Sequence, residues 1–131
     1  MKADDNEHEV KHIRSDKPMD LKLRTRKFAL RVIQLYSALP TTKVAQVLGG
    51  QLLKAGTSVG AHYREGTRAR SVAEFVSKLE GGLQELEESS YWLELMSDAQ
   101  LFKATRLTPL MKEADELIAI LTTCVKNAKG K

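Results

Sequence analysis

The sequence has little of several features that define protein classes. It contains one cysteine, Cys124, so no disulfide can form within the chain, which fits a reducing compartment. No apolar run approaches the roughly 20 residues of a membrane-spanning helix, and the first residues lack the apolar core of a secretory signal. The 131 residues suffice for one domain with an ordinary core. We therefore expect a single-domain, soluble, cytoplasmic protein.

Strand signals are absent as well, and the pattern that is present is helical. Four segments repeat apolar residues at spacings of three and four, which places these residues on one face of an α-helix. Because the links between the segments are short, neighbouring helices must run in opposite directions. The predicted fold is all-α, an antiparallel up-down-up-down four-helix bundle over residues 20–127. Residues 1–19 are expected to form a flexible N-terminal tail and residues 128–131 a frayed basic C-terminus.

Capping residues set the predicted ends of these helices. Ser71 and Glu74 fit the S-x-x-E capping box, in which each side chain hydrogen-bonds a backbone N–H that the first turn leaves free. Pro109 fits the first position of the fourth helix, and Gly66 is expected to end the second helix as a left-handed C-cap. The predicted N-caps are Asp20, Thr41 or Thr42, Ser71 and Thr108.

The apolar faces of the helices define the predicted core. The seam of the first helix consists of Leu21, Thr25, Phe28, Val32, Leu35 and Leu39. Further apolar residues widen this arc beyond what one buried face requires, which indicates a subunit interface; they are Ala29, Ile33 and Tyr36. Gly49, Gly56 and Gly60 fall on one side of the second helix, where each costs up to about 1 kcal/mol relative to alanine. Close approach of another helix would explain these glycines.

Charge is distributed unevenly along the chain. Residues 21–70 hold ten Lys and Arg but only Glu65 as an acid, whereas residues 71–100 hold seven acids and only Lys78 as a base. This asymmetry favours a polyanion or an acidic protein surface as partner, or self-association between opposite faces. The plainer alternative is that these charges are solvated helix surface.

Two groups of cations lie in the positive half of the chain. Arg24, Lys27 and Arg31 follow one another at helical spacing and are expected to form a basic stripe beside the core seam. The second group lies around the turn between the second and third helices and consists of Arg64, Arg68 and Arg70. We expect both groups to contact backbone phosphates of a nucleic acid, with little base stacking because aromatic residues are few.

A literal H-E-x-x-H sequence, from His8 to His12, raises the question of a metal site. In zinc peptidases this pattern places two imidazole ligands on one face of a helix. Here no apolar face anchors the segment, the only further histidine is His62, and a second E-x-x-H for a di-iron site is missing. We therefore predict no metal site and no cofactor.

The remaining sequence offers no arrangement typical of an enzyme. The run of residues 62–65, His-Tyr-Arg-Glu, contains acid–base groups, but the sequence places no serine or cysteine nucleophile near it. We interpret this run as a structural network at a helix end. Cys124 lies on the apolar face of the fourth helix and is expected to be buried packing rather than a reactive thiol. The predicted function is non-enzymatic.

The sequence from about residue 26 to 127 resembles a bacterial four-helix-bundle family, named for proteins encoded in intervening sequences of large-subunit ribosomal RNA. The resemblance is carried above all by residues 56–65 (GTSVGAHYRE), 68–71 (RARS), 73–75 (AEF) and 85–95 (ELEESSYWLEL). It implies a small protein that forms a ring-shaped homopentamer and has no recognised enzymatic activity. The sequence is also similar to the accessory proteins of diversity-generating retroelements, which are basic pentamers that bind a reverse transcriptase and nucleic acid.

Two functional hypotheses follow from the charge pattern and the resemblance. The leading one is a non-enzymatic, oligomeric, nucleic-acid-associated protein that holds RNA or DNA by its backbone phosphates. Its proposed contacts are Arg24, Lys27, Arg31, Arg64, Arg68 and Arg70. The alternative is a protein-interaction adaptor, such as the accessory subunit of a retroelement reverse transcriptase, whose basic face meets an acidic protein. In both cases we expect self-association, no contact with a membrane and no small-molecule cofactor.

Overall fold

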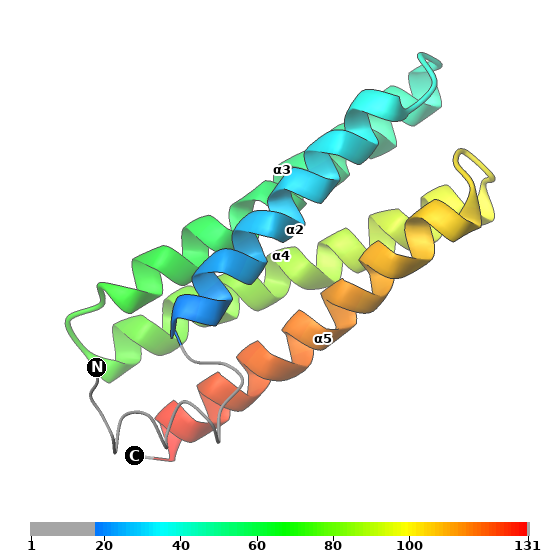
Figure 1. The fold of residues 1–131 in the computed structure, drawn as a ribbon. Helices are drawn as coiled ribbons and strands as arrows, with labels where there is room; N and C mark the ends of the chain where they lie inside the picture. The colour runs from blue at the N-terminus through cyan, green and yellow to red at the C-terminus, as the bar shows by residue number, and fades with distance from the viewer. Residues whose placement is uncertain (1–17, 131) are drawn as a thin grey trace.

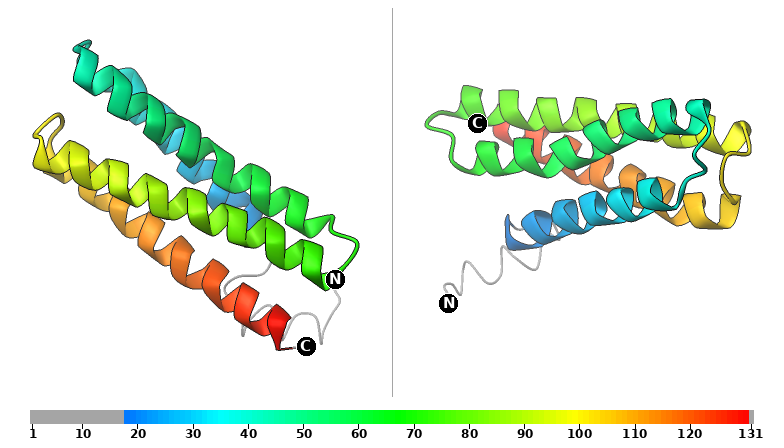
Figure 2. Two further views of the ribbon diagram at one scale, coloured as in Figure 1. Left: turned by 180° about the vertical axis from the view of Figure 1, so that it is seen from behind. Right: turned by 90° about the horizontal axis from the view of Figure 1, so that it is seen from above.

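Four α-helices make up almost all of the chain that the structure describes, residues 18–130. In this computed structural model they are α2 (Pro18–Ala38), α3 (Lys43–Thr67), α4 (Val72–Asp98) and α5 (Ala104–Lys129). The helices lie side by side in one elongated bundle, with the connecting turns at its two ends (Figure 1 and Figure 2). Residues 18–130 contain no strand, which confirms the all-α, four-helix prediction. Residues 1–17 of the predicted N-terminal tail lie outside the described residues, and residues 18 and 19 belong to α2.

The four helices are not equally attached to one another. The helix α3 packs extensively against both α2 and α4, and α4 packs against α5, whereas α2 and α5 make only limited contact. The attachment of α2 to the rest of the bundle is therefore mainly its contact with α3.

The core runs along the inside of all four helices. Every helix contributes side chains with no exposure to solvent, among them Phe28, Leu52, Leu86 and Leu121. Burying one such side chain completely contributes about 1.5–3 kcal/mol relative to leaving it exposed. The predicted seam of α2 is buried along its whole length, including Thr25, whose hydroxyl donates to the Leu21 carbonyl at 2.7 Å. This part of the sequence-based prediction is confirmed.

The glycines of α3 lie where α2 approaches. A Cβ atom added at Gly49 would come within 2.5 Å of Leu39 Cδ1, and one added at Gly60 would come within 3.1 Å of Thr25 Oγ1. At Gly56 the added atom would meet Val32 Cγ2 at 2.8 Å. Each of these contacts is tighter than ordinary van der Waals packing allows, so the absence of side chains lets α2 and α3 come together, as predicted.

Side-chain caps begin α3 and α4. The Ala45 N–H donates to Thr42 Oγ1 at 3.2 Å, which decides between the two threonines predicted for this cap. At the start of α4 the Glu74 N–H donates to Ser71 Oγ at 3.0 Å. The Glu74 carboxylate does not complete the capping box on Ser71; it accepts from the Arg70 N–H at 3.0 Å, one residue earlier.

The predicted glycine cap at the end of α3 is wrong. The helix continues through Gly66 to Thr67, the C-cap is Arg68, and no glycine among the described residues has a positive φ. A Cβ atom at Gly66 would lie 2.5 Å from Leu79 Cδ1. Gly66 therefore serves the packing of α3 against α4 rather than the reversal of the backbone.

The predicted starts of the first and last helices also need correction. The helix α2 begins at Pro18, so Asp20 lies within its first turn rather than capping it. The helix α5 begins at Ala104 after a Lys103 N-cap without a side-chain hydrogen bond. Thr108 is therefore inside the helix, where its hydroxyl donates to the Ala104 carbonyl at 2.8 Å. Pro109 is also inside, although a proline there omits one backbone hydrogen bond.

Candidate nucleic-acid interface

The turn between α3 and α4 brings several cations around one hollow. This hollow, called the turn hollow below, has a volume of about 370 Å³. Its lining consists of Arg64, Glu65, Arg68, Arg70, Glu74 and Lys78. The three arginines that the sequence analysis placed at this turn therefore do come together, and Lys78 of α4 joins them. The sequence analysis did not select Lys78, which stands alone among the acids of its segment.

Backbone hydrogen bonds hold this turn in a defined shape. The Arg68 N–H donates to the Glu65 carbonyl and the Ala69 N–H to the Gly66 carbonyl, both at 3.1 Å. The Glu74 carboxylate fixes the next residue by accepting from the Arg70 N–H. The arginine side chains thus extend from a short connection whose backbone is tied down on both sides.

The charges around the turn hollow are not balanced. Lys78 Nζ lies 3.1 Å from Glu65 Oε1, but both side chains are more than a third exposed, so this pair contributes little to stability, about 0–1 kcal/mol. Among residues 21–130, whose side chains the structure describes, no carboxylate forms an ion pair with Arg64, Arg68 or Arg70. Four cations against two carboxylates leave the hollow positive, and its arginines are available to an anion.

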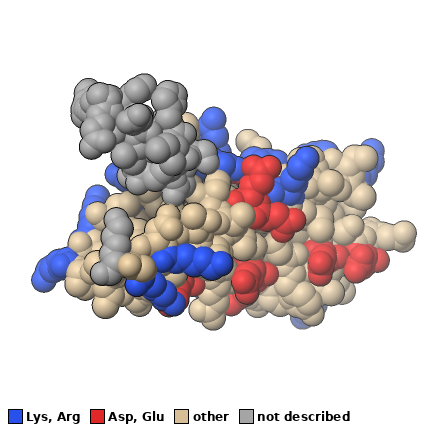
Figure 3. Space-filling view, turned by 90° about the horizontal axis from the view of Figure 1, so that it is seen from below, with Lys and Arg blue, Asp and Glu red and all other residues tan. Residues whose placement is uncertain are grey.

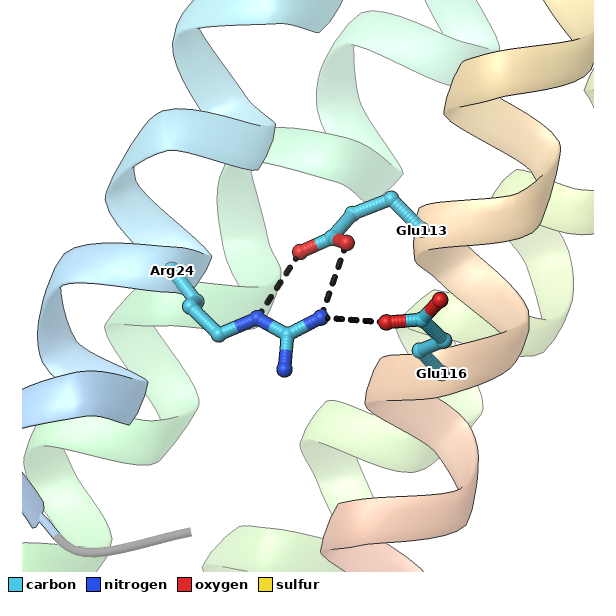
Figure 4. Close-up of polar contacts among 3 residues, drawn as sticks. All are labelled: Arg24, Glu113 and Glu116. Atoms are coloured by element: carbon cyan, nitrogen blue, oxygen red, sulfur yellow. Dashed lines mark hydrogen bonds and ion pairs between the residues drawn. The ribbon is translucent and has the colours of Figure 1, made fainter. Parts of the chain in front are cut away.

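The predicted stripe on α2 is divided by the structure. Arg24 is held by two glutamates of α5 (Figure 4): its Nε donates to Glu113 at 3.1 Å, and one terminal nitrogen donates to Glu113 at 2.8 Å and to Glu116 at 2.9 Å. Lys27 and Arg31 are exposed on the same helix. On the face shown in Figure 3, basic and acidic side chains both reach the surface and lie next to one another in several places. Arg24 therefore joins α2 to α5, whereas the other two cations face solvent.

The contacts of Arg24 also affect its ionisation. The hydrogen bonds with Glu113 raise the pKa of Arg24, burial opposes this rise, and Glu116 adds to it. The Arg24 and Glu113 side chains are 27% and 19% exposed, so water screens this pair only in part. Arg24 therefore stays charged at any pH at which the fold is studied.

The histidine of the 62–65 run packs against α4. His62 Nε2 lies 3.7 Å from Glu85 Oε2, while His62 Nδ1 is buried without a hydrogen-bond partner. A Cβ atom at Gly81 would come within 2.8 Å of His62 Nδ1, so Gly81 provides the space for the ring. Tyr63 is a core residue. This run therefore contacts the neighbouring helix through His62 and the core through Tyr63. The contact between His62 and Gly81 could not be predicted from sequence spacing.

Metal ligands do not gather at any place in the described part of the chain. The side chains of residues 21–130 include no group of three or more His, Cys, Asp or Glu that could hold a metal ion. The H-E-x-x-H sequence from His8 to His12 lies outside the described residues. Cys124 is partly buried and packs against the core. None of the helices among these residues is long and apolar enough to cross a membrane.

The sequence also matches a family model, described as 23S rRNA-intervening sequence protein, over residues 17–123. The chain belongs to this family. The match contains all six cations that the sequence analysis selected, together with the turn hollow. It confirms the family to which the sequence was likened, whereas the relation to retroelement accessory proteins stays a prediction.

A crystal structure from the same fold group supports this assignment. It is described as a protein with unknown function from the S23 ribosomal protein family of Bacteroides thetaiotaomicron VPI-5482. The two sequences are 32% identical, the match covers 81% of this chain and 98% of that chain, and the TM-score is 0.77. Among curated proteins, none matches the chain.

Proposed function

We propose that this chain is a non-enzymatic nucleic-acid-associated protein that acts in the cytoplasm and holds RNA or DNA by its backbone phosphates. The observation that carries the proposal is the turn hollow, where Arg64, Arg68 and Arg70 have no acidic ion-pair partner among the side chains of residues 21–130. The family name, which refers to an intervening sequence of 23S rRNA, supports RNA as the first ligand to test.

The chemistry of the turn hollow suits phosphate rather than bases. A guanidinium presents a planar fork of N–H donors that matches two phosphate oxygens, which makes arginine the preferred residue for this contact. The aromatic residue adjacent to Arg64 is Tyr63, and its side chain is in the core, so it offers no stacking surface. Binding should therefore depend weakly on base sequence and strongly on salt.

The six cations should contribute unequally. Arg64, Arg68 and Arg70 are exposed around one hollow, and Lys27 and Arg31 are exposed on α2. Arg24 is already paired with Glu113 and Glu116, so a phosphate would have to displace two carboxylates to reach it. We therefore assign Arg24 a role in attaching α2 and the other five a role in contacting the nucleic acid.

We also propose that antiparallel up-down-up-down bundles of this chain assemble into a ring-shaped homopentamer. Support comes from exposed apolar residues on the outer side of α2, where Leu23 is 48% exposed and Leu30 and Ile33 are each 42% exposed. A Cβ atom at Gly50 would have nothing within 4 Å, so no contact within the described chain accounts for a glycine there. Contact with a second copy would account for both, through the head-to-tail interface that a ring requires.

The salt dependence of binding tests the nucleic-acid proposal. We expect log affinity to fall linearly with log salt, with a slope of about −0.7 (single strands) to −0.9 (duplexes) for each phosphate neutralised. Replacing Arg64, Arg68 and Arg70 together by Gln should weaken binding and flatten this slope. The matched control replaces three exposed lysines elsewhere on α3 and α5, which are Lys43, Lys54 and Lys112.

The two variants lose the same charge, so a general effect of net charge would weaken both equally. The proposal requires the arginine variant to lose much more affinity than the lysine variant, with unchanged helix content by circular dichroism. If the parent binds neither RNA nor DNA at low salt, the basic surface favours the alternative function. The chain would then be a protein-interaction adaptor, such as a reverse-transcriptase accessory subunit, that meets an acidic protein.

A further inference from the structure

A second hollow, separate from the turn hollow, lies between α2 and α5. It has a volume of about 220 Å³. Arg31 and Gln34 of α2 and Arg106 and Pro109 of α5 line its sides, and the buried Leu35 lies beneath them. This volume is below the roughly 300 Å³ at which pockets begin to accept drug-sized ligands, so it suits one small group. We call it the α2–α5 hollow.

The contact between α2 and α5 shows what this hollow lacks. Arg24 of α2 faces α5 and meets Glu113 there. Seven residues further along α2 stands Arg31, and seven residues back along α5 from Glu113 stands Arg106. Residues seven apart occupy nearly the same side of a helix, so Arg31 and Arg106 repeat the positions of Arg24 and Glu113. At the repeat, the carboxylate is replaced by a second guanidinium.

The two guanidiniums of the α2–α5 hollow have no counter-charge from the described chain. Among the described side chains, residues 21–130, neither Arg31 nor Arg106 forms an ion pair with a carboxylate. The Arg106 guanidinium carbon lies 5.1 Å from the centre of the Phe102 ring, a cation–π contact that orients the group without neutralising it. Two positive charges line this small hollow, and an anion between them would be attracted to both.

We propose that the α2–α5 hollow binds a phosphate group, which takes the place that Glu113 occupies opposite Arg24. A carboxylate offers two oxygens and is filled by one guanidinium fork, as at Arg24, whereas a phosphate offers enough oxygens for two forks that approach from two helices. The Gln34 amide adds a further N–H donor on the α2 side. This site shares no residue with the turn hollow. It uses Arg31, one of the five cations proposed above to contact nucleic acid, but phosphate binding here does not require that function.

Titration with inorganic phosphate tests this site. The Nε–H signals of Arg31 and Arg106 in a nitrogen-15 NMR spectrum of the full chain should shift and saturate. Arg31→Gln and Arg106→Gln should each raise the Kd for phosphate by about tenfold, the loss expected for a hydrogen bond to a charged group. Arg26→Gln removes the same charge from an exposed position of α2 outside the hollow and should leave the Kd unchanged.

A charge replacement provides a variant that should remain folded. Arg106→Glu restores the carboxylate that the repeat lacks, so it should pair with Arg31, abolish the phosphate-dependent shifts and leave the thermal midpoint equal or higher. Absence of saturable shifts in the parent would overturn the proposal, as would equal phosphate binding by the parent and Arg106→Glu. The variant with Arg64, Arg68 and Arg70 replaced by Gln should keep the shifts, which separates this site from the turn hollow.

Two oligonucleotides identify the source of the phosphate. A short strand with a 5′-phosphate and the same strand with a 5′-hydroxyl differ only in the terminal phosphate group. Equal shifts of Arg31 and Arg106 with both strands would assign the hollow to a backbone phosphate. Shifts with the phosphorylated strand alone would assign it to a terminal phosphate. If neither strand shifts these signals while inorganic phosphate does, the ligand is a free phosphate.

Discussion

The helix α2 meets its two neighbours in opposite ways. Against α3 the contact is close and largely apolar, because Gly49, Gly56 and Gly60 leave no side chain between the helices, and near the end of α2 the Tyr36 O–H donates to Gln46 Oε1 at 3.0 Å. Against α5 the contact is limited, and its described polar link is the arginine that pairs with Glu113 and Glu116. A close apolar contact excludes ligands. The charged contact with α5 leaves the α2–α5 hollow at the place where Arg106 stands instead of a glutamate. The candidate phosphate site therefore lies on the side of α2 that makes the more limited helix contact.

The largest expected effect tests the close contact between α2 and α3. In Gly56→Ala the new methyl group would meet three atoms of Val32, a stiff β-branched side chain, at 2.8–3.3 Å. Overpacking of this kind costs about 1–3 kcal/mol, more than the helix propensity that alanine gains. We expect a lower urea midpoint with an unchanged m-value. A variant as stable as the parent would show that α2 is free to move away from α3.

A smaller effect is expected from the polar contact between α2 and α5. Arg24→Gln removes a bidentate pair that is partly exposed, and we expect a loss of about 1.5 kcal/mol, the lower end for hydrogen bonds to charged groups. Lys27→Gln is the matched control, because this exposed lysine has no such pair among the described side chains and should change stability by less than about 0.5 kcal/mol.

The pH dependence of this loss follows from the raised pKa of Arg24. A basic group whose pKa is raised by folding stabilises the fold below its ordinary pKa, and this stabilisation is lost only as the pH rises through the raised value. The difference between parent and Arg24→Gln should therefore be constant from neutral to moderately alkaline pH. Equal stability of the Arg24 and Lys27 variants would show that the ion pair does not hold α2 to α5.

The smallest effect on the single subunit is expected at Gly50, beside the tight position Gly49. The added methyl group of Gly50→Ala meets nothing within 4 Å, so the helix should gain up to about 1 kcal/mol. If a second copy packs against this position, the same change should shift the assembly toward smaller species in light scattering. An assembly of unchanged size and affinity would remove Gly50 from the proposed subunit interface.

The parts of the fold that depend on local chemistry were predictable from the sequence. The caps Thr42 and Ser71 act on backbone N–H groups three residues away, and the buried seam of α2 follows from helical spacing alone. The spacing of Gly49, Gly56 and Gly60 also indicated a close neighbour correctly, because three glycines on one side weaken a helix unless a packing contact compensates for them.

The errors concern features that distant residues decide. Gly66 has the residue type of a helix cap, but it is a glycine because Leu79 of the next helix leaves no room for a side chain there. The fourth helix starts before Thr108 because Leu107 is buried in the core and extends the helix over a stretch that reads as a loop. Local patterns contain no information about such partners.

The cations of the candidate sites also differ in whether nearby or distant residues decide their surroundings. Arg64, Arg68 and Arg70 are near one another in the sequence, so the turn brings them together in any fold that keeps it. The partners of Arg24 are 89 and 92 residues away, and Arg31 and Arg106 line one hollow only because α2 and α5 lie side by side. Sequence spacing could therefore group cations within a helix but could not tell which of them are neutralised.

The contact between His62 and Gly81 has a consequence for how this sequence can vary. The imidazole ring occupies the space that a side chain at position 81 would need. A Cβ atom added at Gly81 would lie 2.8 Å from His62 Nδ1 and 2.9 Å from His62 Cε1. The two positions share one volume, so the residues that each tolerates depend on the other, and their substitutions should be non-additive. Within the family, a larger residue at position 81 should occur only together with a smaller one at position 62.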